Sequence, residues 1–181
     1  TSLETLATLR TPFRPHGKVT PGNASGINDG ATMSLLAAAD TADELGLTGK
    51  MRLVSYSFAG VAPDVMGIGP VPATERALAQ AGLGIEDIGL FEINEAFAVQ
   101  VLSFLDHFGI DQEDPRVNRY GGAIAVGHPL ASSGVRLMTQ LARQFQEDPS
   151  VRYGLTTMCI GLGMGGTVIW ENPNHADFGK D

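Results

Sequence analysis

Apolar and polar positions along the chain follow two different spacings, one typical of strands and one typical of helices. A period of two in residues 52–59 predicts a strand, and short apolar runs predict further strands over 88–93, 153–159 and 167–171. We also interpret residues 123–126 as a short strand, because this apolar run lies between glycines and leads into a Gly-His-Pro corner.

Helical patterns fill most of the intervening sequence. A short one opens the chain, and longer ones predict helices over residues 29–45, 75–81, 95–109 and 133–146. Strands that alternate with helices predict an α/β fold, with a mixed, mostly parallel sheet covered by helices. The last two strands flank a glycine-rich turn at 161–166, which predicts an antiparallel hairpin.

Composition limits the class of protein. The chain has 181 residues, enough to bury a core, and one domain is the default. Glycine accounts for 23 of them, nearly twice the usual share of about 7%. The glycines gather beside polar residues at 22–30, 121–134 and 161–166, which indicates close backbone approaches and not a flexible tract.

Net charge and cysteine content limit the candidate binding partners and the expected cellular compartment. A net charge of −8 without a basic run makes nucleic acid and anionic membranes poor candidate partners. No stretch approaches the roughly 20 apolar residues of a membrane span, so we expect none. The single cysteine excludes an intrachain disulfide and favours a reducing, cytoplasmic setting.

Three distinctive polar groups follow predicted strands: Asn94, His128 and Cys159. The carboxyl ends of strands in such sheets meet at one edge, so we expect these groups to share a pocket. Each also has a structural interpretation. Asn94 could cap a helix that begins at Glu95, Cys159 could be a buried inert thiol, and His128 could be incidental to a tight connection.

The other candidate residues have simpler interpretations. We expect surface or packing roles for His16, His107 and His175, and a structural role for Glu95 in the first turn of its helix. The histidines and the cysteine show no metal-ligand spacing, so we predict no metal. The glycine turn at 161–166 joins two strands instead of a strand and a helix, which argues against a dinucleotide site.

Four motifs, taken together and in this order, resemble the thiolase family: GNASGINDGA (22–31), INEAFA (93–98), GGAIAVGHPLASSG (121–134) and CIGLGMGG (159–166). The segment MGIGPVPA (66–73) also looks like the family pattern. The resemblance is to the C-terminal half of degradative thiolases, acetyl-CoA C-acyltransferases of the fatty-acid-oxidation complex β-subunit type. It implies the thiolase fold, here the C-terminal half of the αβαβα layered architecture.

The resemblance also implies a division of the chain into four parts. Residues 1–20 would be the tail of a loop domain, and residues 21–50 a helix that completes the N-terminal thiolase domain. Residues 51–173 would form the C-terminal thiolase domain, and 174–181 a polar, loose tail.

Matching motif positions carry the family's catalytic roles onto four residues. The resemblance implies that His128 activates a nucleophilic cysteine and helps to bind the thioester oxygen. It implies that Cys159 is the acid/base for the substrate carbon or the leaving group. Asn94 would hold a water in the first oxyanion hole, and the Gly161 amide would contribute to the second. These residue types suit the chemistry, because oxyanions need fixed donors and carbon acids need a group of near-neutral pKa.

Substrate contacts follow from the same comparison. Ser25, Ala96 and Phe97 match positions that contact the pantetheine arm of coenzyme A, although Ser25 could equally be a turn residue that bonds its own backbone. Coenzyme A would be a substrate, and no covalently bound cofactor is implied.

One departure from the family pattern concerns the nucleophile. The family's acyl-accepting cysteine lies in the N-terminal half, whereas the only cysteine here is Cys159. The resemblance therefore implies thiolytic cleavage of 3-oxoacyl-CoA in fatty-acid β-oxidation, but only together with an N-terminal segment that carries the nucleophile. An isolated half should expose a large apolar face. A homo-oligomer, dimer or tetramer, is also implied, and a hydratase/dehydrogenase α subunit is a further candidate partner.

Other functions stay open at this point. One is a non-catalytic acyl-CoA-binding or scaffolding module that kept the fold without the nucleophile, and another is a biosynthetic, acetoacetyl-CoA-forming thiolase. A ketoacyl synthase is disfavoured, because those enzymes resemble this pattern but place histidine or asparagine where Cys159 stands.

Overall fold

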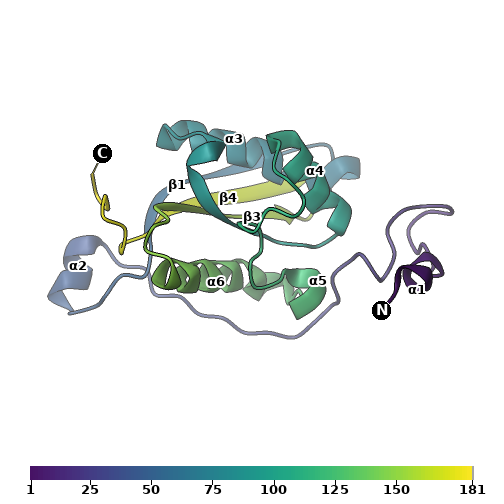
Figure 1. Ribbon diagram of the computed structural model, residues 1–181, viewed down its shortest axis with the longest axis horizontal. Helices are drawn as coiled ribbons and strands as arrows, with labels where there is room; N and C mark the ends of the chain where they lie inside the picture. Colours follow the sequence, from purple (N-terminus) through teal and green to yellow (C-terminus); the bar gives the residue numbers. More distant parts are fainter. Residues whose placement is uncertain (181) are drawn as a thin grey trace.

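The computed structural model describes residues 1–180, in which a mixed four-stranded sheet lies between two layers of helices (Figure 1). The strand order is β1-β4-β3-β2, with bounds β1 (Arg52–Gly60), β2 (Ile88–Ile93), β3 (Tyr153–Ile160) and β4 (Met164–Glu171). The predicted hairpin is confirmed, although β4 begins at Met164 and the turn is correspondingly short.

The mixed sheet is also confirmed, but the expected majority of parallel pairings needs correction. Only β2 and β3 are parallel, whereas β4 is antiparallel to both of its neighbours, β1 and β3. The hairpin explains this difference, because it inserts β4 between β3 and β1 and so creates both antiparallel pairings.

Helices cover both faces of the sheet. Helices α3 (Pro70–Ala81) and α4 (Ala98–Phe108) lie on one face, and α6 (Ser133–Glu147) lies on the other (Figure 1). Strand β2 is apolar throughout most of its length because it serves both layers. Phe91 and Ile93 belong to the core under α3 and α4, whereas Leu90 packs with Leu141 of α6.

The start of α3 and the start of β4 meet backbone to backbone. A Cβ at Gly165 would lie 2.0 Å from the Gly69 carbonyl carbon, so no side chain can be accommodated there. Two residues further on, the hydroxyl of Thr167 lies 2.8 Å from that of Thr74 and 2.7 Å from that of Thr157. These contacts fix the hairpin, and therefore the end of β3, against α3.

The predicted helix over residues 29–45 is wrong in most of its length. Only α2 (Ala39–Glu44) is helical, and residues 29–38 have no regular structure. Met33 and Leu35 in this segment are 93% and 79% exposed. A short helix is stable mainly when its apolar side is packed, and these apolar side chains stay largely exposed instead of entering the core. The helix expected to complete an N-terminal domain within residues 21–50 is therefore reduced to α2.

The predicted strand over residues 123–126 is a helical turn, α5 (Ala123–Val126). A four-residue apolar run does not distinguish the two structures. Here Glu95 decides the outcome, because its Oε2 accepts a hydrogen bond of 3.1 Å from the Ile124 amide in the first turn of α5. Glu95 thus has the structural role expected of it, but on a different helix.

The remaining differences lie at the ends of elements. The chain opens with α1 (Leu3–Ala7), as predicted, and α3 begins at Pro70 because proline is well tolerated in the first helical turn. The tail contacts β1, since the Phe178 ring lies 5.2 Å from the Arg52 guanidinium. Asp181, the last residue of the predicted tail, lies outside the described residues. None of the helices in residues 1–180 is long and apolar enough to cross a membrane.

Candidate active site

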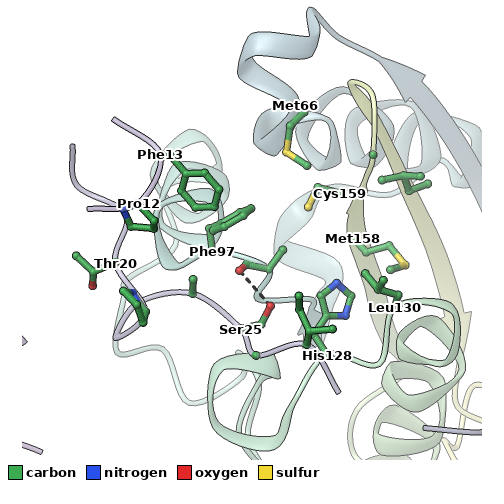
Figure 2. A pocket seen from close by; sticks show the side chains of 17 residues that line it. Pro12, Phe13, Thr20, Ser25, Met66, Phe97, His128, Leu130, Met158 and Cys159 are labelled. Atoms are coloured by element: carbon green, nitrogen blue, oxygen red, sulfur yellow. Dashed lines mark hydrogen bonds between the residues drawn. The ribbon is translucent and has the colours of Figure 1, made fainter. Parts of the chain in front are cut away.

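A cavity of about 640 Å³ opens between the N-terminal segment, the start of α4, the Gly-His-Pro corner and the end of β3 (Figure 2). Six of the seven residues singled out from the sequence line it: Ser25, Ala96, Phe97, His128, Cys159 and Gly161. The seventh, Asn94, is fully buried and contacts His128. The histidines predicted to have other roles do not line this cavity.

The Gly-His-Pro corner is held by a distant part of the chain. The Asn28 Oδ1 accepts a hydrogen bond of 3.0 Å from the His128 amide, and Ile27 pairs with His128 in a short parallel bridge. Gly127 has φ of 100°, and a Cβ there would lie 2.8 Å from Asn28 Oδ1. Glycine is required at this corner for both reasons. The structure thus carries His128 on a helix-to-helix corner and not at a strand end.

Both nitrogens of the His128 imidazole have partners. Nδ1 lies 2.6 Å from the hydroxyl of Ser133, and Nε2 lies 3.3 Å from Nδ2, the side-chain amide nitrogen of Asn94. Because the Asn94 Nδ2 donates, Nε2 is the accepting nitrogen and Nδ1–H donates to Ser133. This arrangement gives the tautomer in which Nε2 carries the lone pair.

The environment keeps His128 neutral. Burial lowers the pKa of His128 below its usual value of 6.5, and the positive charge of Arg136 lowers it further. A neutral imidazole can accept a proton from a thiol, as the base of a nucleophile must.

Asn94 lies directly after β2, and its position is fixed from two sides. The backbone N–H of Asn94 donates to the Thr157 carbonyl over 2.9 Å. The side chain of Asn118 accepts a hydrogen bond from the backbone N–H of Ile93 and donates one to its backbone carbonyl. The capping interpretation is wrong, because α4 begins at Ala98 and its N-cap is Phe97. The side-chain Oδ1 of Asn94 is buried without a hydrogen-bond partner among residues 1–180, so it remains free to accept a hydrogen bond beside His128.

Cys159 lies near the end of β3, and its thiol points into the cavity (Figure 2). It is 6% exposed, and its Sγ lies 3.4 Å from the Oε1 of Gln100. Burial raises the pKa of Cys159 above its usual value of 9.0, so the side chain is a protonated thiol at neutral pH. Gly161 follows in the hairpin turn, where a Cβ would meet nothing within 4 Å beyond its chain neighbours, so the backbone is open to the cavity.

The remaining wall of the cavity is apolar. Phe13 and Phe97 meet edge to face, with ring centroids 6.0 Å apart. Ser25 donates to the Ala96 carbonyl from both its amide and its hydroxyl, at 3.0 and 3.3 Å, while its side chain faces the cavity. The turn interpretation of Ser25 is wrong, because its hydroxyl bonds the distant Ala96 carbonyl and not its own backbone. The substrate-contact interpretation stays a prediction. An apolar cavity with a few polar groups is typical of small-molecule sites.

Sequence reasoning missed the residues that support the site. Ser133, Gln100 and Asn118 each bond a site residue or the strand end that carries one. Ser133 could have been found within the Gly-His-Pro motif, because it lies about one helical turn after the corner. Gln100 and Asn118 gave no signal, since only the folded chain brings them to Cys159 and Ile93.

A buried carboxyl group lies behind Asn94. Glu92 is fully buried, and its Oε1 accepts a hydrogen bond of 2.6 Å from Gln144 of α6, whereas its Oε2 has no partner among residues 1–180. Burial raises the pKa of Glu92 to about 7, against the lowering effects of Gln144 and Arg136. Burial also lowers the pKa of Arg136.

Comparisons with known proteins bear on this site. A family profile described as "Thiolase, C-terminal domain" matches residues 47–172, and one described as "Thiolase, N-terminal domain" matches residues 1–40. The chain is 48% identical over 171 residues to the 3-oxoadipyl-CoA/3-oxo-5,6-dehydrosuberyl-CoA thiolase of Escherichia coli, a match that covers 94% of this chain and 42% of that protein. It is also 48% identical over 173 residues to the 3-ketoacyl-CoA thiolase FadA of Escherichia coli, covering 94% and 44%.

Solved structures agree with the sequence comparison. Human mitochondrial 3-ketoacyl-CoA thiolase superposes with a TM-score of 0.86 at 38% identity, covering 96% of this chain and 43% of that one. The Bacillus anthracis acetyl-CoA acetyltransferase superposes with a TM-score of 0.87 at 39% identity, covering 93% and 42%. The chain spans less than half the length of these relatives. The predicted fold and family are confirmed, and the chain belongs to the thiolase family.

Proposed function

We propose that this chain supplies the C-terminal half of an acyltransferase that cleaves 3-oxoacyl-CoA with coenzyme A, giving acetyl-CoA and a shortened acyl-CoA in fatty-acid β-oxidation. The observation that carries the proposal is the meeting of a neutral imidazole, a protonated thiol and an open backbone amide around one apolar cavity. The nucleophilic cysteine would come from an N-terminal segment, since the chain contains only Cys159.

In the first half of the reaction, His128 Nε2 takes the proton of the nucleophilic thiol, and the thiolate attacks the 3-oxo carbon of the substrate. The bond between C2 and C3 then breaks, the acyl group stays on the cysteine, and the electron pair forms the enolate of acetyl-CoA. Cys159 gives its proton to C2 and becomes a thiolate. Protonated Nε2 of His128 and a water on Asn94 would donate to the thioester oxygen, and the Gly161 amide would donate to the tetrahedral oxyanion.

In the second half, the thiol of free coenzyme A gives its proton to the Cys159 thiolate and attacks the acyl-cysteine. The nucleophilic cysteine leaves as a thiolate and takes back its proton from His128. Both acid/base groups thus return to their starting protonation states, a neutral imidazole and a thiol, as the environments of His128 and Cys159 favour.

Substrate binding follows the shape and polarity of the cavity. Coenzyme A enters as a substrate, with its pantetheine arm along Ser25, Ala96 and Phe97, and no covalently held cofactor or metal takes part in the proposal. The apolar lining suits an uncharged arm and an acyl chain.

Exposed apolar side chains support a partner segment. Met33, Leu35, Tyr56 and Phe58 are each more than half exposed, an unusual number for a free surface. We propose that residues 21–50 complete the N-terminal thiolase domain, that residues 1–20 extend from a loop domain, and that residues 51–173 form the C-terminal domain. The assembled protein would be a cytoplasmic homo-oligomer, with a hydratase/dehydrogenase α subunit as a candidate partner.

The decisive experiment combines this chain with the N-terminal segment and measures acetyl-CoA released from acetoacetyl-CoA or a longer 3-oxoacyl-CoA. We expect turnover that is lost in Cys159→Ala and His128→Ala and kept in His107→Ala, since His107 is an exposed histidine outside the cavity. A complex that binds acyl-CoA without turnover would instead identify a binding module. Comparing thiolysis with condensation would separate degradative from biosynthetic function.

A further inference from the structure

Gln100 links two parts of the candidate site. It is the third residue of α4, and it is 3% exposed. Its Nε2 donates to the backbone carbonyl of Asn94 over 3.1 Å, and its Oε1 accepts from the Cys159 thiol over 3.4 Å. One side chain thus joins the end of β2 to the thiol on β3.

The partners of Gln100 determine which way its amide points. A backbone carbonyl can only accept, so the amide nitrogen must face Asn94. The oxygen is then left to face the sulfur of Cys159. An acceptor at this place stabilises S–H, which can donate to it, and opposes a thiolate, which cannot.

We propose that Gln100 is a positioning residue. It keeps Cys159 protonated, and it fixes the direction of the Cys159 S–H bond relative to Asn94. The inference rests on the proposed acid/base role of Cys159, because such a group must hold a proton until the enolate forms. Gln100 itself lies behind the thiol and does not line the main cavity.

Other groups around Cys159 do not supply this effect. Among the described residues that line the cavity, His128 is the only other titratable side chain, and no carboxylate is present. The other neighbours of the thiol include Met66, from residues 63–68, and Met158, from β3. Both side chains are uncharged. Burial is the largest cause that raises the pKa of Cys159, and a backbone hydrogen bond acts in the opposite direction. Among the side chains around the thiol, the Gln100 carbonyl is the uncharged acceptor that favours the thiol over the thiolate.

The single cysteine of the 181-residue chain makes a direct test possible, because Cys159 is then the only thiol that iodoacetamide can alkylate. The rate of alkylation is measured from about pH 6 to about pH 11 in the chain and in Gln100→Met, which preserves length and removes both polar atoms. We expect the inflection to fall by about half a pKa unit to one unit. The control is Gln80→Met, on the exposed side of α3, which should leave the profile unchanged. An unchanged or raised inflection in Gln100→Met would overturn the proposal.

A second measurement needs no substitution and so does not depend on how the variant folds. The S–H stretching band of Cys159 is recorded by Raman spectroscopy in the unaltered chain. We expect the lowered frequency of a hydrogen-bonded thiol, and a band at the position of a free thiol would refute the bond to Gln100. Neither measurement involves turnover, so each result is independent of the acyl-transfer assay that tests the proposed function.

Discussion

The buried carboxyl group of Glu92 should make the stability of this protein depend on pH in an unusual direction. Its pKa is raised from 4.5 to about 7 in the folded protein, chiefly by burial. Between these two values the folded state keeps a proton that the unfolded state has lost, so stability falls as pH rises through this window. The difference of about 2.5 pKa units corresponds to about 3 kcal/mol of unfolding free energy.

The substitution Glu92→Gln removes the titration and keeps the shape of the side chain. Urea unfolding is followed by the fluorescence of Trp170, the only tryptophan, which packs with Leu90 and Leu141 in the core. As pH rises from about 4.5 to about 8, the unaltered chain loses stability through Glu92 and the variant does not. We therefore expect the unfolding free energy of the variant to rise relative to that of the unaltered chain by about 3 kcal/mol over this range. Glu86→Gln, at an exposed glutamate, serves as the control. Parallel stability curves for the Glu92→Gln variant and the unaltered chain would refute the reasoning.

Three further outcomes test the framework of the site. Gly165→Ala places a methyl group into the Gly69 backbone and should lower the free energy of unfolding by about 3 kcal/mol or more, measured by urea unfolding. Asn118→Ala removes two bonds to the end of β2 and should speed amide exchange there, whereas an unchanged rate contradicts this role. Arg136→Met removes a positive charge near His128 and should raise the pKa of His128 in an NMR titration, whereas a lower value contradicts the assigned cause.

The four strands of the sheet, and the grouping of Asn94, His128 and Cys159, could be predicted from sequence because local patterns determine them. Alternation in β1 and the apolar run of β2 follow from which faces are buried, and the three polar residues at 94, 128 and 159 follow apolar runs closely. The share of parallel pairings could not be predicted this way. This share depends on which strand pairs with the second edge of β4, and that pairing is a property of the whole sheet.

The two wrong secondary-structure predictions have opposite causes. Residues 29–38 have a helical pattern, but Met33 and Leu35 stay largely exposed, so propensity alone does not produce a helix. The apolar run at residues 123–126 is too short to distinguish a strand from a helix. A distant carboxylate, that of Glu95, stabilises the helical turn. In neither case does the local pattern by itself decide the structure.

The wall of the cavity formed by residues 12–27 has a consequence for folding kinetics. No side chain in the first 30 residues is buried, yet Asn28 and Thr32 bond His128 and Ser132 across 100 positions of sequence. Closing a loop of that size is entropically costly, and little apolar burial accompanies it. We therefore expect the sheet to form first and this wall to dock in a separate, later step. The same weak attachment would let the wall open and close while the sheet stays folded.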